Sequence, residues 1–231
     1  MDARRSSARF ALTLVGASLL GSLPAMAIEE PSYDVVERLG ATEIRAYEPV
    51  VVAETVVDGE FDRAGNAAFR RLAGYIFGGN RVREGANGSA RIAMTAPVGM
   101  RPTPTGESAK IAMTAPVGMR PAGAAETAGG AGSWVVSFTM PRTWTLATLP
   151  VPDDPLVTLR EVPARTVAAL RFSGFWNEER FAEKERELRA ALAGSAWQIA
   201  GPAESARYNP PWTPWFLRRN EVLLELRRAR G

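Results

Sequence analysis

The pattern of apolar and polar positions predicts two groups of strands. Residues 33–38 and 42–47 alternate polar and apolar side chains about a turn at Gly40, and residues 50–57 are rich in β-branched side chains. Residues 156–161 and 166–172 have the same character, and residues 215–226 contain a last strand. Such patterns are typical of antiparallel sheets.

A helical pattern follows each group of strands. The first helix is expected between a cap at Asp62 and the turn at residues 78–80, with apolar or small residues every three or four positions: Phe61, Gly65, Ala68, Leu72 and Ile76. Phe69 and Ala73 form a second apolar stripe of this helix below Asn66. A second helix is expected from a cap at Asn177 to Gly194. Two halves that each contain strands, a helix and further strands predict an α+β fold with internal pseudo-symmetry.

An exact repeat occupies the middle of the chain, where residues 92–102 reappear as residues 111–121. Residues 103–107 between the copies have strong turn chemistry, so we expect the copies to form two arms of a hairpin, each interrupted at a proline. Residues 122–133 are rich in glycine and alanine and are expected to form a mobile surface loop.

The first residues have the features of a secretory signal peptide. Three arginines precede the apolar residues 10–23, and Ala25-Met26-Ala27 follows, which predicts cleavage after Ala27. The apolar run is short for a membrane span, which needs about 20 residues. We therefore expect a periplasmic or secreted protein made of one domain, residues 28–231, with no stable membrane insertion after cleavage.

Composition restricts the chemistry that the chain can perform. The chain has no cysteine and no histidine, which excludes disulfides, thiolate nucleophiles, Ser-His-Asp triads and zinc sites built from those residues. Its formal net charge of +3 falls to +1 when residues 1–27, with three arginines and one aspartate, are removed. A nearly balanced charge argues against nucleic acid as a partner.

Several motifs, in one order along the chain, resemble the SOUL haem-binding proteins. They are Glu30-Pro31-Ser32-Tyr33, Glu43-Ile44-Arg45-Ala46-Tyr47, Tyr75-Ile76-Phe77-Gly78-Gly79-Asn80, Met-Thr-Ala-Pro-Val at 94–98 and 113–117, Phe138-Thr139-Met140-Pro141, Phe172-Ser173-Gly174, Tyr208-Asn209-Pro210-Pro211-Trp212 and Arg218-Arg219-Asn220-Glu221-Val222. The resemblance implies a distorted antiparallel β-barrel with two flanking helices, built by pseudo-twofold duplication of a β-α-β-β unit. This fold is shared with effector-binding domains and with some hydrolases, so it does not by itself assign a function.

The resemblance also implies a non-covalent haem in an apolar groove beside the first helix. The implied lining is Asn66, Phe69 and Ala73 on the helix, with Tyr208 and Thr213 on the later segment. Basic residues that meet the haem propionates in some relatives align with Asn66 and Thr213.

Two further residues are candidates for this groove, each with an alternative role. Met94 is a soft groove wall or a core residue. Arg218 grips carboxylates or pairs with a carboxylate of the chain itself. Without histidine, only tyrosinate or methionine could ligate the iron.

Three functions follow from these observations. The first is an exported carrier, buffer or scavenger of haem or another tetrapyrrole, which is a binding role and not an enzymatic one. The second is a binding module for another apolar or amphipathic small ligand. The third is a hydrolase on the same barrel that uses Glu221 and Tyr208.

Overall fold

The computed structural model describes residues 29–83, 111, 113–122, 132–209 and 212–229. Its elements in chain order are β1 (Tyr33–Leu39), β2 (Thr42–Tyr47), β3 (Val50–Asp58), α1 (Phe61–Ile76), β4 (Asn80–Arg81), β5 (Val117–Pro121), β6 (Ser133–Thr139), β7 (Val151–Pro152), β8 (Thr158–Val162), β9 (Arg165–Phe172), α2 (Glu178–Leu192), β10 (Trp197–Arg207), the 3-10 turn η1 (Trp215–Leu217) and β11 (Asn220–Arg228). The predicted strands and helices are present within a few residues of their expected bounds.

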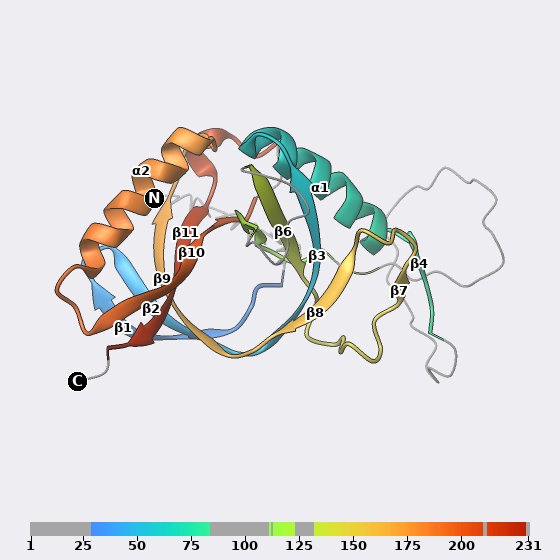
Figure 1. Ribbon diagram of the computed structural model, residues 1–231, viewed down its shortest axis with the longest axis horizontal. Helices are drawn as coiled ribbons and strands as arrows, with labels where there is room; N and C mark the ends of the chain where they lie inside the picture. Colours follow the sequence, from blue (N-terminus) through green and yellow to red (C-terminus); the bar gives the residue numbers. More distant parts are fainter. Residues whose placement is uncertain (1–28, 84–110, 112, 123–131, 210–211, 230–231) are drawn as a thin grey trace, which may run out of the picture.

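Nine strands form one antiparallel sheet in the order β1-β2-β9-β11-β10-β5-β6-β3-β8. The sheet curls around a central space, and both helices lie outside it (Figure 1). Edge strands β1 and β8 do not pair with each other in the part of the chain that the structure describes. The fold class is the expected α+β arrangement, but the sheet is open and does not close into a barrel.

The duplication appears in the strand order. The unit β2-β3-α1-β5-β6 corresponds to β8-β9-α2-β10-β11, and the two units meet where β5 pairs with β10. The first strand of each unit pairs with the second strand of the other unit, β2 with β9 and β8 with β3. This exchange joins the halves at three places in one sheet.

The two helices begin differently. Asn177 caps α2 as predicted, because its Oδ1 accepts a hydrogen bond from the backbone N–H of Arg180 at 2.8 Å. The N-cap of α1 is Glu60, whose side chain makes no capping bond, and Asp62 lies in the first turn. The prediction of Asp62 as the cap was therefore wrong by two residues. The negative charge of Asp62 in the first turn still stabilises α1, because the N-terminus of a helix carries a partial positive charge.

The sheet separates two apolar clusters. The larger one packs between the helices and the sheet and includes Phe61, Leu72, Phe138, Leu188 and Leu224. The smaller one lies on the opposite, inner face of the sheet and consists of Ala115, Val167, Ala169, Ala206, Tyr208 and Leu223. Neighbouring residues of a strand therefore face different surroundings.

The second copy of the repeat does not pair as a hairpin arm along β5. Residues 117–119 pair with β6 on one side and with β10 on the other, so both edges of this stretch are occupied. The first copy, with Met94, and most of the Gly/Ala-rich segment lie outside the described residues. No helix of the described part is long and apolar enough to cross a membrane.

Candidate functional site

A buried polar cluster lies on the inner face of the sheet, around Glu221. The side chain of Glu221 is 0% exposed. It accepts hydrogen bonds from Nη1 and Nη2 of Arg45 at 2.8 and 3.2 Å, from the Tyr208 hydroxyl at 2.7 Å and from Nε of Arg219 at 3.1 Å. We call these four residues the Glu221 cluster.

Small side chains on β9 allow this cluster to form. Arg45 is on β2 and Glu221 is on β11, so β9 lies between them in the sheet. Val167 and Ala169 of β9 face the same side and are fully buried. Because they are short, the long arginine side chain can cross over β9 to the carboxylate.

The electrostatics of the cluster do not suit catalysis. Burial opposes ionisation of Glu221, but hydrogen bonds and charges from Arg45, together with the Tyr208 and Arg219 contacts, hold its pKa below the ordinary value. Burial and the neighbouring Glu221 raise the pKa of Tyr208 far above its usual range. The carboxylate is thus a weak base and the phenol stays protonated, and Glu221 has no exposed surface for a substrate.

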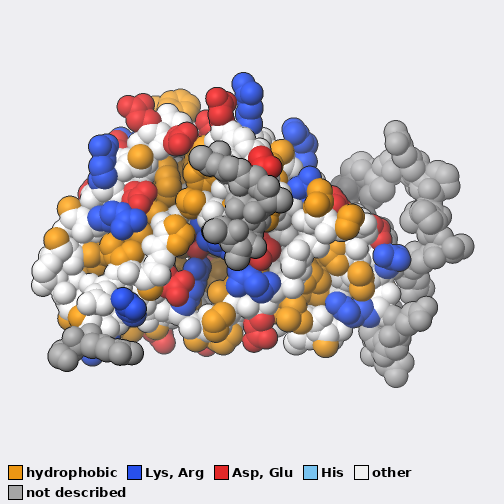
Figure 2. Space-filling view, in the orientation of Figure 1, with side chains coloured by type: hydrophobic (Ala, Val, Ile, Leu, Met, Phe, Trp, Pro, Cys, Tyr) orange, Lys and Arg blue, Asp and Glu red, His pale blue; other side chains and the backbone are white. Residues whose placement is uncertain are grey.

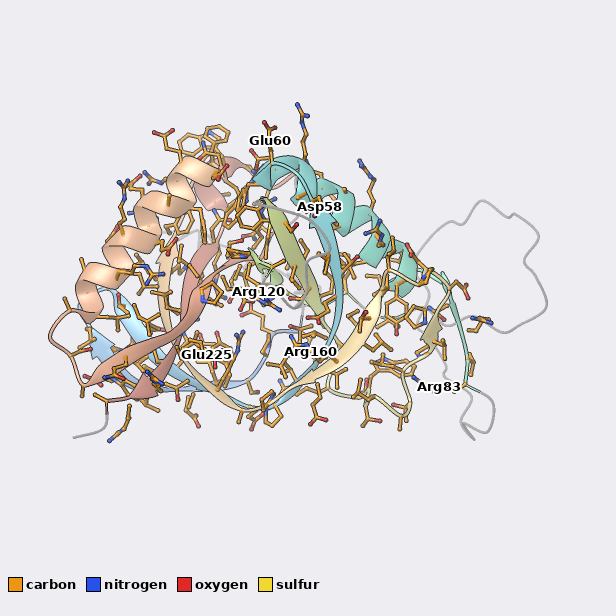
Figure 3. The ribbon with its side chains drawn as sticks, in the orientation of Figure 1. Asp58, Glu60, Arg83, Arg120, Arg160 and Glu225 are labelled. Atoms are coloured by element: carbon orange, nitrogen blue, oxygen red, sulfur yellow. The ribbon has the colours of Figure 1, made fainter. Side chains whose placement is uncertain are left out.

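A wider cleft opens on the same face, between the two halves of the sheet. It encloses about 770 Å³, solvent at its mouth included, and its walls carry apolar residues such as Val52 and Leu223. Charged residues alternate along it: Glu48, Glu54, Arg120, Arg160, Arg165 and Glu204. Figure 2 shows charged side chains gathered at the middle of this face, and Figure 3 shows Arg120 and Arg160 directed toward the central space.

Most charges of this cleft are paired across strands. Arg160 donates to Glu54 through Nε at 3.0 Å and Nη2 at 2.9 Å, and Arg165 donates to Glu204 at 3.0 Å. Glu204 also approaches the backbone of Gly118, where an added Cβ would lie 2.6 Å from its Oε1. The cleft is therefore polar and close to electrically neutral.

The molecule exposes aromatic side chains on the loop before α2 and on the segment between β10 and β11 that contains η1. We call Phe175, Trp212, Trp215, Phe216 and Leu217 the aromatic surface; all five are exposed, Trp212 by 81% and Phe175 by 64%. The rings of Phe175 and Trp215 are stacked, with centroids 5.3 Å apart. Gly174 donates its N–H to the carbonyl of Trp215, which holds the two loops together.

This surface continues inward to a partly buried arginine. Trp176, next to Phe175 in the chain, stacks on Phe61 of α1 with ring centroids 5.4 Å apart. The guanidinium carbon of Arg207 lies 4.3 Å from the Trp176 ring centroid. Burial is the main cause that lowers the pKa of Arg207 to about 10; attraction to Asp62 opposes this shift, and a smaller repulsion from Arg218 adds to it.

The structure brings together only part of the predicted groove. Asn66, Phe69 and Ala73 follow one another along α1, with Asn66 exposed and Phe69 packed against Phe138 at 5.4 Å between ring centroids. Tyr208 belongs to the Glu221 cluster on the other face of the sheet, away from α1.

The later segment supplies two of the predicted residues. Thr213 and Arg218 belong to the loop of the aromatic surface, where Arg218 Nε donates to the Thr213 carbonyl at 2.8 Å. The positive charge of Arg218 acts on Arg207. Met94 lies outside the described residues.

Sequence reasoning missed Arg207, Trp176 and Phe175. A usable signal was present for Arg207, because consecutive strand residues point to opposite faces and Tyr208 was already chosen. Four aromatic or leucine residues at 212 and 215–217 were also visible as an unusually apolar loop.

Comparisons with known proteins agree on family and fold. Residues 28–225 match the family model described as SOUL heme-binding protein. The chain is 36% identical over 75 residues to "Heme-binding protein 1" of Sus scrofa; the match covers 32% of this chain and 39% of that protein. The chain thus spans about two fifths of the length of the curated relative that it matches.

Solved structures share the fold at low sequence identity. The C-terminal domain of EcmrR has a TM-score of 0.52 and 7% identity, covering 85% of this chain and 99% of that one. A hydrolase from Listeria innocua has a TM-score of 0.50 and 8% identity, covering 80% and 91%. These likenesses concern the fold alone. The family match spans most of the chain, and the chain therefore belongs to the SOUL heme-binding protein family.

Proposed function

We propose that this chain is an exported protein that binds haem or a related tetrapyrrole against the aromatic surface and the adjoining start of α1. The observation that carries the proposal is the exposed, stacked pair Phe175 and Trp215, with Arg207 packed on Trp176, the residue that follows Phe175. Large apolar patches on a soluble surface commonly mark binding sites. Family membership supports a tetrapyrrole as the ligand.

The residues present fit a flat apolar ligand with acidic groups. Aromatic faces stack on a porphyrin ring, and burial of apolar area contributes roughly 25 cal/mol per Å² before the costs of association. Arg207 and Arg218 place positive charge beside the rings. When bound, haem would supply the redox or ligand-binding chemistry of its iron, while the protein would hold the ring and exclude water.

We propose that no tyrosine ligates the iron. Tyr208 donates its hydroxyl to Glu221, and Tyr75 donates its hydroxyl to the carbonyl of Pro150 at 3.0 Å. Tyr47 accepts a hydrogen bond from Arg45, and Tyr33 lies under the Arg45 guanidinium at 4.4 Å. None of the four tyrosines belongs to the aromatic surface, so binding rests on ring contacts and charge.

The proposed role is transport, buffering or scavenging in the periplasm or outside the cell. An enzymatic role for Glu221 and Tyr208 is not part of the proposal, because the carboxylate is buried and held ionised by two arginines. Nucleic acid is not proposed as a partner, because the net charge of the chain is small.

The test is a titration of the purified protein with ferric haem, followed by the Soret absorption band and by tryptophan quenching. The variant Phe175→Ser with Trp215→Ser should weaken binding at least tenfold, because both rings are exposed contacts. Val36→Ser on β1 is the control, since it removes an exposed apolar side chain elsewhere. Equal affinity of both variants and the wild type would refute the aromatic surface as the site.

The central cleft favours a second candidate, a small amphipathic ligand other than a tetrapyrrole. Its walls combine apolar side chains with paired charges, as a ligand of mixed polarity requires. Arg120→Trp should fill the cleft and abolish thermal stabilisation by such a ligand, whereas the Phe175→Ser, Trp215→Ser variant should retain it. The opposite pattern would exclude the cleft.

A further inference from the structure

We propose that Arg207, with Trp176 beside it, is the carboxylate-binding residue of the tetrapyrrole site and makes the site selective for ligands that carry an acidic side chain. This inference rests on the proposed function. Arg207 lies on β10, one residue before the motif that begins at Tyr208.

The first argument is that unsatisfied hydrogen-bond donors gather here. In the described part of the chain, three buried side-chain atoms have no hydrogen-bond partner: Nε1 of Trp176, Oγ of Ser205 and Nη2 of Arg207. Ser205 and Arg207 are two residues apart on β10 and so face the same side, and Arg207 contacts Trp176. Buried polar groups in proteins are nearly always paired, so this clustering needs an explanation.

The second argument is that the charge of Arg207 is poorly compensated within the chain. The nearest carboxylate is Asp62, whose Oδ1 lies 3.9 Å from Nη2, beyond hydrogen-bond distance, and whose side chain is mostly exposed. Arg218 adds a second positive charge close by. By contrast, Arg45, Arg160 and Arg165 on the inner face each have a carboxylate at 3.0 Å or less.

The third argument is that a ligand can reach the residue. The side chain of Arg207 is 32% exposed, although Nη2 itself is directed toward Gly65 of α1. A Cβ at Gly65 would lie 3.8 Å from Nη2, so the glycine leaves the guanidinium close to the helix backbone. A carboxylate arriving from the solvent side would complete the ion pair that Asp62 makes only weakly.

Together these observations define the ligand chemistry. The ring contacts suit a flat apolar body, and the planar guanidinium suits a carboxylate, which it can bind through two parallel N–H bonds. The buried indole N–H of Trp176 is a further donor that has no hydrogen-bond partner within the described part of the chain. The site therefore fits an aromatic macrocycle with a carboxylate on its rim better than a neutral one.

The experiment compares mesoporphyrin IX, which has two carboxylates and no iron, with its dimethyl ester, in one buffer with the same trace of non-ionic detergent. Dissociation constants come from quenching of tryptophan fluorescence. The full chain is used as wild type, Arg207→Met, Arg207→Lys and Arg81→Met. Methionine keeps an apolar stem against Trp176, and Arg81 is an exposed arginine of β4, beyond the other end of α1, that controls for loss of one positive charge.

The expected result is that Arg207→Met weakens binding of the acid about tenfold or more and changes binding of the ester less than twofold. Arg207→Lys should restore part of the affinity for the acid, and Arg81→Met should leave the affinity for both ligands unchanged. An equal loss for acid and ester, or no loss for the acid, would overturn the assignment of Arg207 while leaving tetrapyrrole binding intact. If the wild type binds neither porphyrin, the proposed function fails and this inference fails with it. Thermal melting of each variant confirms that it is folded.

Discussion

Removal of the charge of Glu221 should strongly destabilise the fold. In Glu221→Gln the shape of the side chain is kept, but Arg45, which is 3% exposed, loses the carboxylate 2.8 Å away. Breaking a buried ion pair by removing one partner costs about 3–5 kcal/mol. Arg45 retains Glu43 at 2.9 Å, and that side chain is partly exposed, so we expect a value near the lower end, about 3 kcal/mol.

Urea unfolding monitored by tryptophan fluorescence measures this loss. For a domain of this size, about 3 kcal/mol corresponds to a fall in Tm of roughly 6–12 °C. The double variant Arg45→Met, Glu221→Gln should be less destabilised than the sum of its single variants, because the second change removes the charge that the first one left unpaired. Additive effects would mean that the two side chains do not stabilise each other.

The pH dependence gives a second test of the same pair. Burial raises the pKa of Glu221, but Arg45 and the other donors outweigh it, so the pKa in the folded protein lies below the ordinary value of 4.5. The unfolded chain therefore binds more protons, and this contribution is present above the unfolded pKa and lost as the pH falls through the folded pKa. The difference between wild type and Glu221→Gln should shrink on acidification below about pH 4.5.

The refuting result has a functional meaning. A carboxylate kept for catalysis is commonly held at a cost, and its replacement then stabilises the protein. If Glu221→Gln were neutral or more stable than the wild type, the Glu221 cluster would not be structural. The hydrolase alternative would then need to be considered again.

Two further stability predictions test local packing. Gly118→Ala should cost about 1–3 kcal/mol, because its Cβ would lie 2.6 Å from Oε1 of Glu204, and unfolding in urea checks it. Gly74→Ala in α1 is the matched control, since no atom lies within 4 Å of the added Cβ. It should stabilise the protein by about 0.5–1 kcal/mol. Equal destabilisation by both variants would contradict the steric argument. Asn177→Ala should lose about 1 kcal/mol with the cap bond to Arg180 N–H, while Asn177→Asp should lose little, as thermal melting can show.

Most of the fold followed from periodicity, and the exceptions have physical causes. Strand β10 was missed because Gly201 and Pro202 interrupt its alternation, at a shift of register between Ile199 and Ala203. Closure of the barrel was also expected, and it depends on whether the edge strands β1 and β8 meet. Closure is a long-range geometric property that no local pattern contains.

The candidate site was harder to predict because one step along a strand reverses the direction of a side chain. Arg207 and Tyr208 are adjacent, yet Arg207 contacts Trp176 on the helix side and Tyr208 bonds to Glu221 on the inner side. The motif that begins at Tyr208 indicates that this segment is functional. Which of its residues faces α1 depends on the register of β10 with β5 and β11.

Because the proposed binding site and the Glu221 cluster lie on opposite faces of the sheet, mutations should be able to change ligand affinity and stability separately. The aromatic surface is exposed and contributes little to the core, so changes at Phe175 or Trp215 should alter ligand affinity without a large change in unfolding free energy. Glu221 is 0% exposed and lies on the opposite, inner face of the sheet, so Glu221→Gln should lower stability while leaving the affinity of the folded protein unchanged. A loss of affinity at temperatures where the Glu221→Gln variant is still folded would show that the two faces are coupled through the sheet, and the separation of roles argued from strand alternation would be wrong.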